Sequence, residues 1–205
     1  VLDDPMSGER AAARAWAPVV LALALSGRTG EAEAATPAAL AVSFRLVDEL
    51  PSLVGAVLVS RCVGLWLAGE LVELARSSEA LLGSGEPDPA DETRGFRAFL
   101  LGRAHLARGL VPEATLQLRE AAAMLREHDP GRVLAWCLSG LAQARALAGD
   151  AEGAEAALTE CDAERSPAFR VWEAELLLAR AWTRLAAGER TAARALAAEA
   201  ADLAH

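Results

Sequence analysis

The sequence predicts an all-α fold, a superhelical solenoid of about five antiparallel helical hairpins. Alanine, leucine, glutamate and arginine dominate the 205 residues, and all four favour helices. Strand-forming residues are scarce, because isoleucine and tyrosine are absent and only 4 phenylalanines occur. Glycines that end helices recur at a nearly constant interval, which indicates stacked copies of one helical unit.

The repeated unit is clearest between Leu147 and Leu158, where one helix ends and another begins. Gly149 can take the left-handed conformation that closes the last helical turn. Asp150 can accept free backbone N–H groups of the next helix, and its charge suits the positive end of that helix. The same corner is predicted at glycines separated by 42, 40, 40 and 39 residues, namely Gly27, Gly69, Gly109, Gly149 and Gly188.

A small residue follows these corners at a fixed distance. An alanine lies five residues after four of the glycines, and the second repeat has Leu74 there with Ala75 beside it. The distance between packed helices depends on the side chains at their contact, so alanine allows a close approach. The four alanines are Ala32, Ala114, Ala154 and Ala193.

Prolines divide the first part of the chain into predicted helices, after a lead-in over residues 1–8. Pro18 either bends the first helix or marks its true start. Pro37 disturbs the second helix, which resumes from Ala41, and Pro51 breaks the chain before the third. The predicted helices here are 9–26, 29–50, 52–68 and 70–82.

A loop over residues 83–90, rich in glycine and proline, separates the second and third repeats. Pro112 falls in the first turn of a helix, where its missing N–H is no loss. Asp129-Pro130 and Ser166-Pro167 each join a cap residue to a first-turn proline. The next predicted helix begins at Asp91 or Thr93 and ends at 108, and two more span 112–127 and 130–149. A helix then begins at Asp150, and the last two helices span 167–188 and 189–204. We predict a single helical-repeat domain over residues 9–204.

The corner Gly149-Asp150-Ala151-Glu152-Gly153-Ala154 resembles that of a tetratricopeptide repeat. Trp16, eleven residues before Gly27, occupies the tryptophan position of that motif, and Gly102 and Ala142 occupy its small helix-crossing position. The chain departs from the motif in its period, which is near 40 residues where the motif has about 34. It also departs at the tyrosine position, which holds Leu23, Leu65, His105, Arg145 or Arg184. The resemblance implies a tetratricopeptide-like solenoid.

Long repeats rich in alanine, leucine and arginine also resemble the helical region of large ATP-binding LuxR-type bacterial transcriptional regulators. The segments Leu25–Ala32 and Leu147–Ala154 are typical of that region. The resemblance implies a region that senses a ligand or protein, with ATPase and helix-turn-helix parts outside this chain. The chain has no lysine, so it cannot contain the GxxxxGK[ST] motif. Because it begins without methionine and ends at His205 without a stop signature, we expect a fragment of a longer protein.

The net charge of −9 argues against direct contact with nucleic acid, which favours clustered positive charge. Cys62, Cys137 and Cys161 are far apart, so we expect buried thiols in a reducing cytoplasm and neither a disulfide nor a zinc site.

Acidic residues precede any apolar run, so no signal peptide is expected. Arg61 interrupts residues 50–69, the best membrane candidate, so no membrane span is expected. The absence of residues with AT-rich codons indicates a high-GC, bacterial source.

The sequence offers little for catalysis. His105 and His128 lack the spacing of four residues that would place two imidazoles on one metal. Glu127, His128 and Asp129 are neighbours at a helix end and are not expected to converge on a substrate. No GxSxG elbow and no pairing of histidine with cysteine is recognised. We therefore predict no enzyme, no catalytic residue, no metal and no cofactor.

A candidate groove follows from the repeat register. In tetratricopeptide arrays the first helix of each hairpin lines the concave surface, so the resemblance implies that positions thirteen, ten, six and three before each corner glycine face inward. Aromatic anchors beside an arginine and an amide suit a peptide or a small apolar ligand. The alternative is that these aromatics pack between hairpins, and both interpretations stay open. The candidate groove residues are Trp66, Phe96, Phe99, Arg103, Trp136, Ser139, Gln143 and Trp182.

Alanines surround the last predicted helix on nearly every side, whereas a terminal helix should carry a polar outer face. We expect this helix to be covered by a further repeat or by a second copy, giving a homo-oligomer. The leading prediction is a non-catalytic binding scaffold, the ligand- or protein-sensing region of a LuxR-type regulator. The alternative is a general tetratricopeptide adaptor for protein assembly. The expected partners are a protein, a peptide or a small apolar ligand, with no nucleic acid and no membrane.

Overall fold

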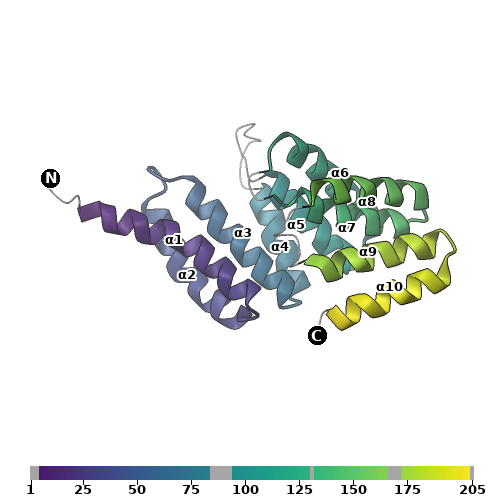
Figure 1. Ribbon diagram of the computed structural model, residues 1–205. Coiled ribbons are helices and arrows are strands. Elements are labelled where there is room, and N and C mark those ends of the chain that lie inside the picture. Colours follow the sequence, from purple (N-terminus) through teal and green to yellow (C-terminus); the bar gives the residue numbers. More distant parts are fainter. Residues whose placement is uncertain (1–4, 84–93, 130–131, 166–171, 204–205) are drawn as a thin grey trace. The chain divides into compact units, whose positions relative to one another are not determined.

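The computed structural model describes residues 5–83, 94–129, 132–165 and 172–203. Over these residues it contains ten helices and no strand, which confirms the predicted all-α class (Figure 1). The helices are α1 (Pro5–Leu25), α2 (Thr29–Arg45), α3 (Ser52–Leu67), α4 (Leu71–Gly83), α5 (Arg94–Ala107), α6 (Val111–Glu127), α7 (Leu134–Leu147), α8 (Ala151–Glu164), α9 (Glu173–Ala186) and α10 (Arg190–Leu203).

The chain divides into two compact units, Val1–Ser84 and Gly85–His205. In the first unit, α3 packs against both α1 and α2 and then against α4. In the second unit, α7 packs against the hairpin of α5 and α6, and α9 packs against the hairpin of α7 and α8. Each unit is therefore a stack in which the first helix of a hairpin lies on the hairpin before it. A single domain over residues 9–204 stays a prediction.

All five predicted corner glycines adopt the left-handed conformation, with φ between +75° and +84°. At each corner, the N–H after the glycine donates to the carbonyl four residues before the glycine, at 2.8–2.9 Å. This bond pairs a carbonyl that the end of a helix would otherwise leave free. At the fourth corner, Asp150 accepts a hydrogen bond from the Gly153 N–H at 2.8 Å, as its predicted cap role requires. The glycine period therefore marks the true helix ends.

Gly27 gives a direct test of this conformation, because a Cβ placed there would have no atom within 4 Å. Replacement by alanine should therefore cost about 1–2 kcal/mol from the left-handed backbone alone. Gly30 is the matched control, since it lies in the same unit inside α2 and its Cβ would also meet open space. Gly30→Ala should be neutral or stabilise by up to about 1 kcal/mol. Urea unfolding followed by circular dichroism measures both, and shifts of the same sign would contradict the role of Gly27.

Small residues set the spacing within the hairpins. A Cβ on Gly102 would lie 2.6 Å from Leu118 Cγ, so α5 and α6 approach closely only because this position lacks a side chain. The residues five places after the corner glycines are all buried, including Leu74 in the second repeat. A close approach of the two helices is shown for α5 and α6.

Several predicted boundaries were wrong. Helix α1 begins at Pro5 inside the expected lead-in, and α2 continues through Pro37 without a break and ends at Arg45. A proline removes one N–H bond, but α2 keeps a buried face that holds Ala32 and Ala39, and this burial outweighs the local cost. Proposed caps at residues 91, 93 and 166, most of the loop 83–90 and the prolines at 130 and 167 lie outside the described residues.

Helix α7 begins later than predicted, at Leu134. The Asp129 carboxylate nevertheless accepts hydrogen bonds from the N–H groups of Val133 and Leu134, at 2.9 and 2.8 Å. Asp129 therefore caps the start of α7, although it lies farther from the helix along the chain than a standard N-cap residue does.

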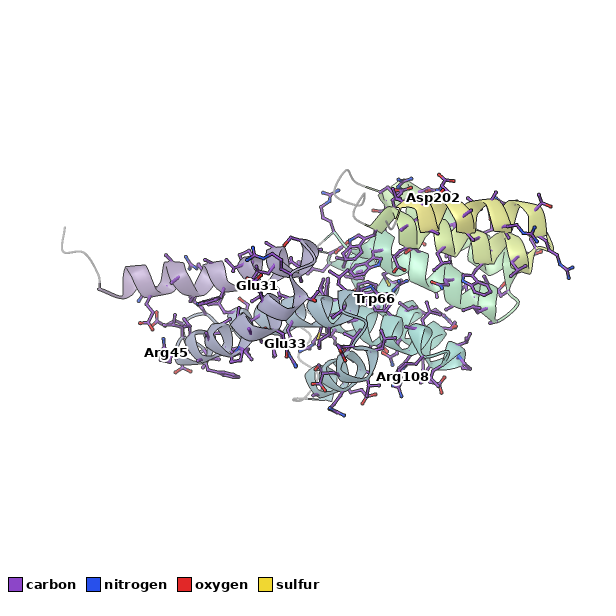
Figure 2. The ribbon with its side chains drawn as sticks, turned by 90° about the horizontal axis from the view of Figure 1, so that it is seen from below. Glu31, Glu33, Arg45, Trp66, Arg108 and Asp202 are labelled. Carbon is purple, nitrogen blue, oxygen red and sulfur yellow. The ribbon has the colours of Figure 1, made fainter. Side chains whose placement is uncertain are left out.

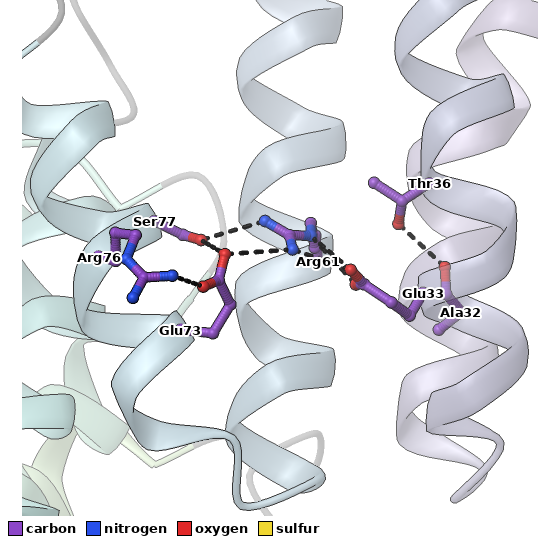
Figure 3. Close-up of polar contacts among 7 residues, drawn as sticks. All are labelled: Ala32, Glu33, Thr36, Arg61, Glu73, Arg76 and Ser77. Atoms are coloured by element: carbon purple, nitrogen blue, oxygen red, sulfur yellow. Dashed lines mark hydrogen bonds and ion pairs between the residues drawn. The ribbon is translucent and has the colours of Figure 1, made fainter.

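Arg61 on α3 holds α2 and α4 in the first unit (Figure 3). Its guanidinium pairs with Glu33 at 2.8 Å and donates to the Ser77 hydroxyl at 3.1 Å, and Glu73 lies 3.5 Å away. The hydrogen bond to Glu33 is the largest cause that raises the pKa of Arg61, so its charge is secure. Glu33 projects from α2, whose last residue is Arg45 (Figure 2). The arginine that interrupts the apolar run 50–69 thus links three helices.

Among the described residues, no helix has both the length and the apolar character needed to cross a membrane.

Candidate functional site

Three first helices, α5, α7 and α9, carry most of the predicted groove residues, and α7 packs against both α5 and α9. Phe96, Phe99 and Arg103 come from α5, and Trp182 comes from α9. Helix α7 supplies the remaining three, Trp136, Ser139 and Gln143, while Trp66 lies on α3 in the other unit (Figure 2).

A continuous series of aromatic rings runs through the second unit. The centroids of Phe96 and Phe99 are 5.6 Å apart, and Phe99 meets Trp136 edge to face at 4.5 Å. Trp136 then stacks on Trp172 with centroids 3.6 Å apart and an interplanar angle of 9°. The two edge-to-face pairs add to the stability that burial supplies. Trp172 was missed by sequence analysis, because it precedes α9 and lies outside the repeat register.

The Arg103 guanidinium lies in the interior of the same unit, with only 1 % of the residue exposed. It forms an ion pair with Glu175 of α9, and its Cζ is 6.0 Å from the Trp136 ring centroid. Gly140 on α7 makes room for it, since a Cβ there would lie 2.9 Å from Arg103 Cδ. The pair therefore joins α5 to α9 past the glycine of the helix between them. Glu175 lies at an inward position of the predicted register, thirteen residues before Gly188, but was not among the eight candidate groove residues.

The eight candidate groove residues divide into two groups. Ser139 is fully buried, and its hydroxyl donates to the Trp136 carbonyl at 2.8 Å. Phe99, Arg103 and Trp136 are also buried, and they have partners in other hairpins, which is the packing that sequence analysis kept as the alternative. Contact with a ligand stays a prediction for all eight. The partly exposed group comprises Trp66, Phe96, Gln143 and Trp182.

In the last hairpin, residues at the same register positions are exposed to solvent. Leu178 and Leu185 are 36 % and 43 % exposed, and together with Trp182 they border a hollow of about 380 Å³ between α9 and α10. These two helices run antiparallel from the corner at Gly188 (Figure 1). We call this surface the α9–α10 face, and its lining residues are Leu178, Ala181, Trp182, Leu185, Arg190, Ala193, Arg194 and Ala197.

A second, polar hollow of about 270 Å³ lies where α6, α7 and α8 meet. Its walls include Arg126, Asp129 and Glu164. Asp129 already accepts two backbone hydrogen bonds, and Arg126 is paired with Glu160 at 2.6 Å. Arg126 donates to Glu160 and thereby lowers the pKa of that carboxyl. The charged groups here therefore hold helices together, and the hollow offers weaker grounds for a site than the α9–α10 face.

The three cysteines are free and buried. Burial raises the pKa of Cys62 to about 11 and that of Cys161 to about 12, and it raises the pKa of Cys137 as well. The thiol of Cys161 donates to the Ala135 carbonyl at 3.1 Å. Thiolate is the reactive form of cysteine, so these thiols have the character of packed apolar groups. Within the described ranges, no three histidine, cysteine or acidic side chains lie close enough together to hold a metal.

Comparison with known proteins supports the fold. A solved structure of nearly identical TPR-like repeats, from a candidate kinesin light chain of Podosopora anserina, matches with a TM-score of 0.60. The match covers 93 % of each chain at 19 % sequence identity, so it establishes the tetratricopeptide-like fold alone. No model of a known protein family matches this chain. No curated protein matches it either.

Proposed function

We propose that this chain is a non-catalytic scaffold that binds another protein. The observation that carries the proposal is the α9–α10 face, where Leu178 and Leu185 are 36 % and 43 % exposed beside Trp182. Exposed apolar surface around a hollow is typical of interaction sites in soluble proteins. Repeat folds also present extended surfaces to partners, which fits the stacked hairpins of this chain.

The experiment is a selection of peptides from a phage-displayed random library on the immobilised, folded chain, followed by calorimetry on the selected sequences. We expect peptides that bind with micromolar or lower Kd. A failure to select any specific peptide, together with turnover in a broad substrate screen, would reject the scaffold function in favour of an enzyme. Loss of that turnover in His105→Ala would place the chemistry at a side chain that we assign no role.

The finer role, the sensing region of a LuxR-type transcriptional regulator, rests on the sequence resemblance of segments such as Leu147–Ala154. Ligand binding would then favour one arrangement of the repeats and bias an attached effector domain, which requires different affinities for two states. The gene sequence beyond the codon for His205 tests this role. A helix-turn-helix there supports the regulator, and its absence supports the general adaptor.

A further inference from the structure

The α9–α10 face corresponds to surfaces that are covered in the two preceding hairpins. Counting from the corner glycines, Leu178 matches Phe99 and Ser139, and both of these are fully buried. Ala197 likewise matches Leu118 and Leu158, which are 0 % and 5 % exposed. In each earlier hairpin of the second unit, the first helix of the next hairpin supplies the cover.

Contacts at individual residues show how the cover is made. On the α5–α6 hairpin, Gly140 of α7 lies against both Arg103 and Leu118, and the Cys137 thiol donates to the Leu118 carbonyl at 3.5 Å. On the α7–α8 hairpin, Arg184 of α9 pairs with Glu155 at 3.5 Å. In both cases the covering element is a helix, and on the α7–α8 hairpin its flank carries a charge opposite to the one it faces.

The α9–α10 face has apolar residues at the same positions as the covered hairpins. Its flank, however, carries positive charge where the α7–α8 hairpin carries negative charge. Six residues after the corner, the fourth hairpin has Glu155 and the fifth has Arg194. Arg190 and Arg194 both line the hollow, one helical turn apart. Among the described residues, neither guanidinium has an ion-pair partner. A covering helix must therefore present a carboxylate where α9 presents Arg184.

The two arginines also stand at an unfavourable place in their own helix. Arg190 begins α10, and positive charge near a helix N-terminus opposes the helix dipole. Like charges four residues apart add a further repulsion. The other second helices carry an acidic residue in the first turn instead, namely Glu31, Glu73, Glu113 and Glu152. An acidic partner would relieve both effects.

We infer that the α9–α10 face binds an amphipathic α-helix of a partner protein, with a stripe of small and apolar residues on Leu178, Trp182 and Ala197 and a carboxylate beside Arg194. This inference rests on the proposed scaffold function and specifies its site and the kind of partner. The partner helix takes the place that α7 and α9 occupy on the preceding hairpins.

The probe is a lactam-stapled peptide of residues 173–186, which is the helix that covers the α7–α8 hairpin. One version keeps Arg184 and the other carries Arg184→Glu. The staple is needed because an isolated helix of this length is marginal in water. Calorimetry with the full chain should show that the Arg184→Glu peptide binds about two- to fivefold more tightly, as expected for one partly exposed ion pair. With the Arg194→Glu chain, the preference should reverse.

Variants of the chain locate the binding site. Leu178→Asp should weaken both peptides at least about tenfold, because it places a charge under the apolar stripe. Leu116→Asp is the matched control, since Leu116 is 62 % exposed on α6 and lies outside the face. It should leave binding unchanged, and both variants should keep the Tm of the native chain within a few degrees because both positions are exposed.

Three results would overturn the inference. The first is equal binding of the peptides to the native chain and to Leu178→Asp. The second is absence of the charge reversal with Arg194→Glu. The third is self-association of the native chain in sedimentation that Leu178→Asp abolishes, which would make a second copy the occupant. If peptides from the phage library still bind Leu178→Asp with full affinity, the scaffold function holds and this face is not its site.

Discussion

Replacing Trp136 with alanine should lower the free energy of unfolding of the second unit by about 3–5 kcal/mol. The side chain is among the largest in the chain, and the residue is only 1 % exposed. It contacts Phe99 on one side and stacks on Trp172 on the other, so its removal leaves a cavity and interrupts the aromatic series. Guanidinium chloride unfolding followed by circular dichroism measures the loss.

Trp182→Ala is the control for this substitution. Trp182 lies at a position of the same register but is partly exposed on the α9–α10 face, so its truncation should cost less, about 1 kcal/mol. The two substitutions distinguish the groove interpretation of the register from the packing interpretation. A groove residue should tolerate truncation and lose binding, whereas a packing residue should lose stability. If Trp136→Ala unfolds as the native chain does and only weakens a selected peptide, the packing interpretation is wrong.

The hairpin corners were predictable because each is fixed by a few adjacent residues. Only glycine adopts the left-handed conformation without a steric cost, so Gly149 and its counterparts mark helix ends directly in the sequence. Asp150 needs only the Gly153 N–H three residues ahead. Helix ends that depend on packing were less predictable. Pro37 is an example, because the buried face of α2 outweighs the break that this proline indicates.

The candidate site was predictable in its positions and not in its exposure. The repeat register brings Phe99 and Trp136 together, but a register cannot say whether the next hairpin covers them. Cover depends on how far the helices rotate in a 40-residue repeat, which is a property of the whole stack. The register also places Glu175 on the inward face, but it could not show that this carboxylate pairs with Arg103, which lies 72 residues away in the chain.

The ion pair of Arg103 with Glu175 supports the second large prediction. Replacing Glu175 with glutamine should destabilise the second unit by about 3 kcal/mol, because it removes a carboxylate charge that is paired with a buried guanidinium. The Arg103 side chain is 2 % exposed and that of Glu175 is 27 % exposed, which places the effect at the lower end for a buried pair. Denaturant unfolding at neutral pH measures the change.

The double variant Arg103→Met with Glu175→Gln should recover at least half of that loss, since an apolar chain of similar length then fills the site and no charge is buried.

A double-mutant cycle isolates the coupling between the two residues. The surface pair of Arg126 and Glu160 provides the reference, with side chains 46 % and 35 % exposed and an expected coupling of about 0.2–1 kcal/mol. A coupling for Arg103 and Glu175 no larger than this reference would show that solvent screens the pair. Helices α5 and α9 would then be joined only through α7, which packs against both. A larger coupling would make Gly140→Ala destabilising as well, because the added methyl displaces the guanidinium that the glycine accommodates.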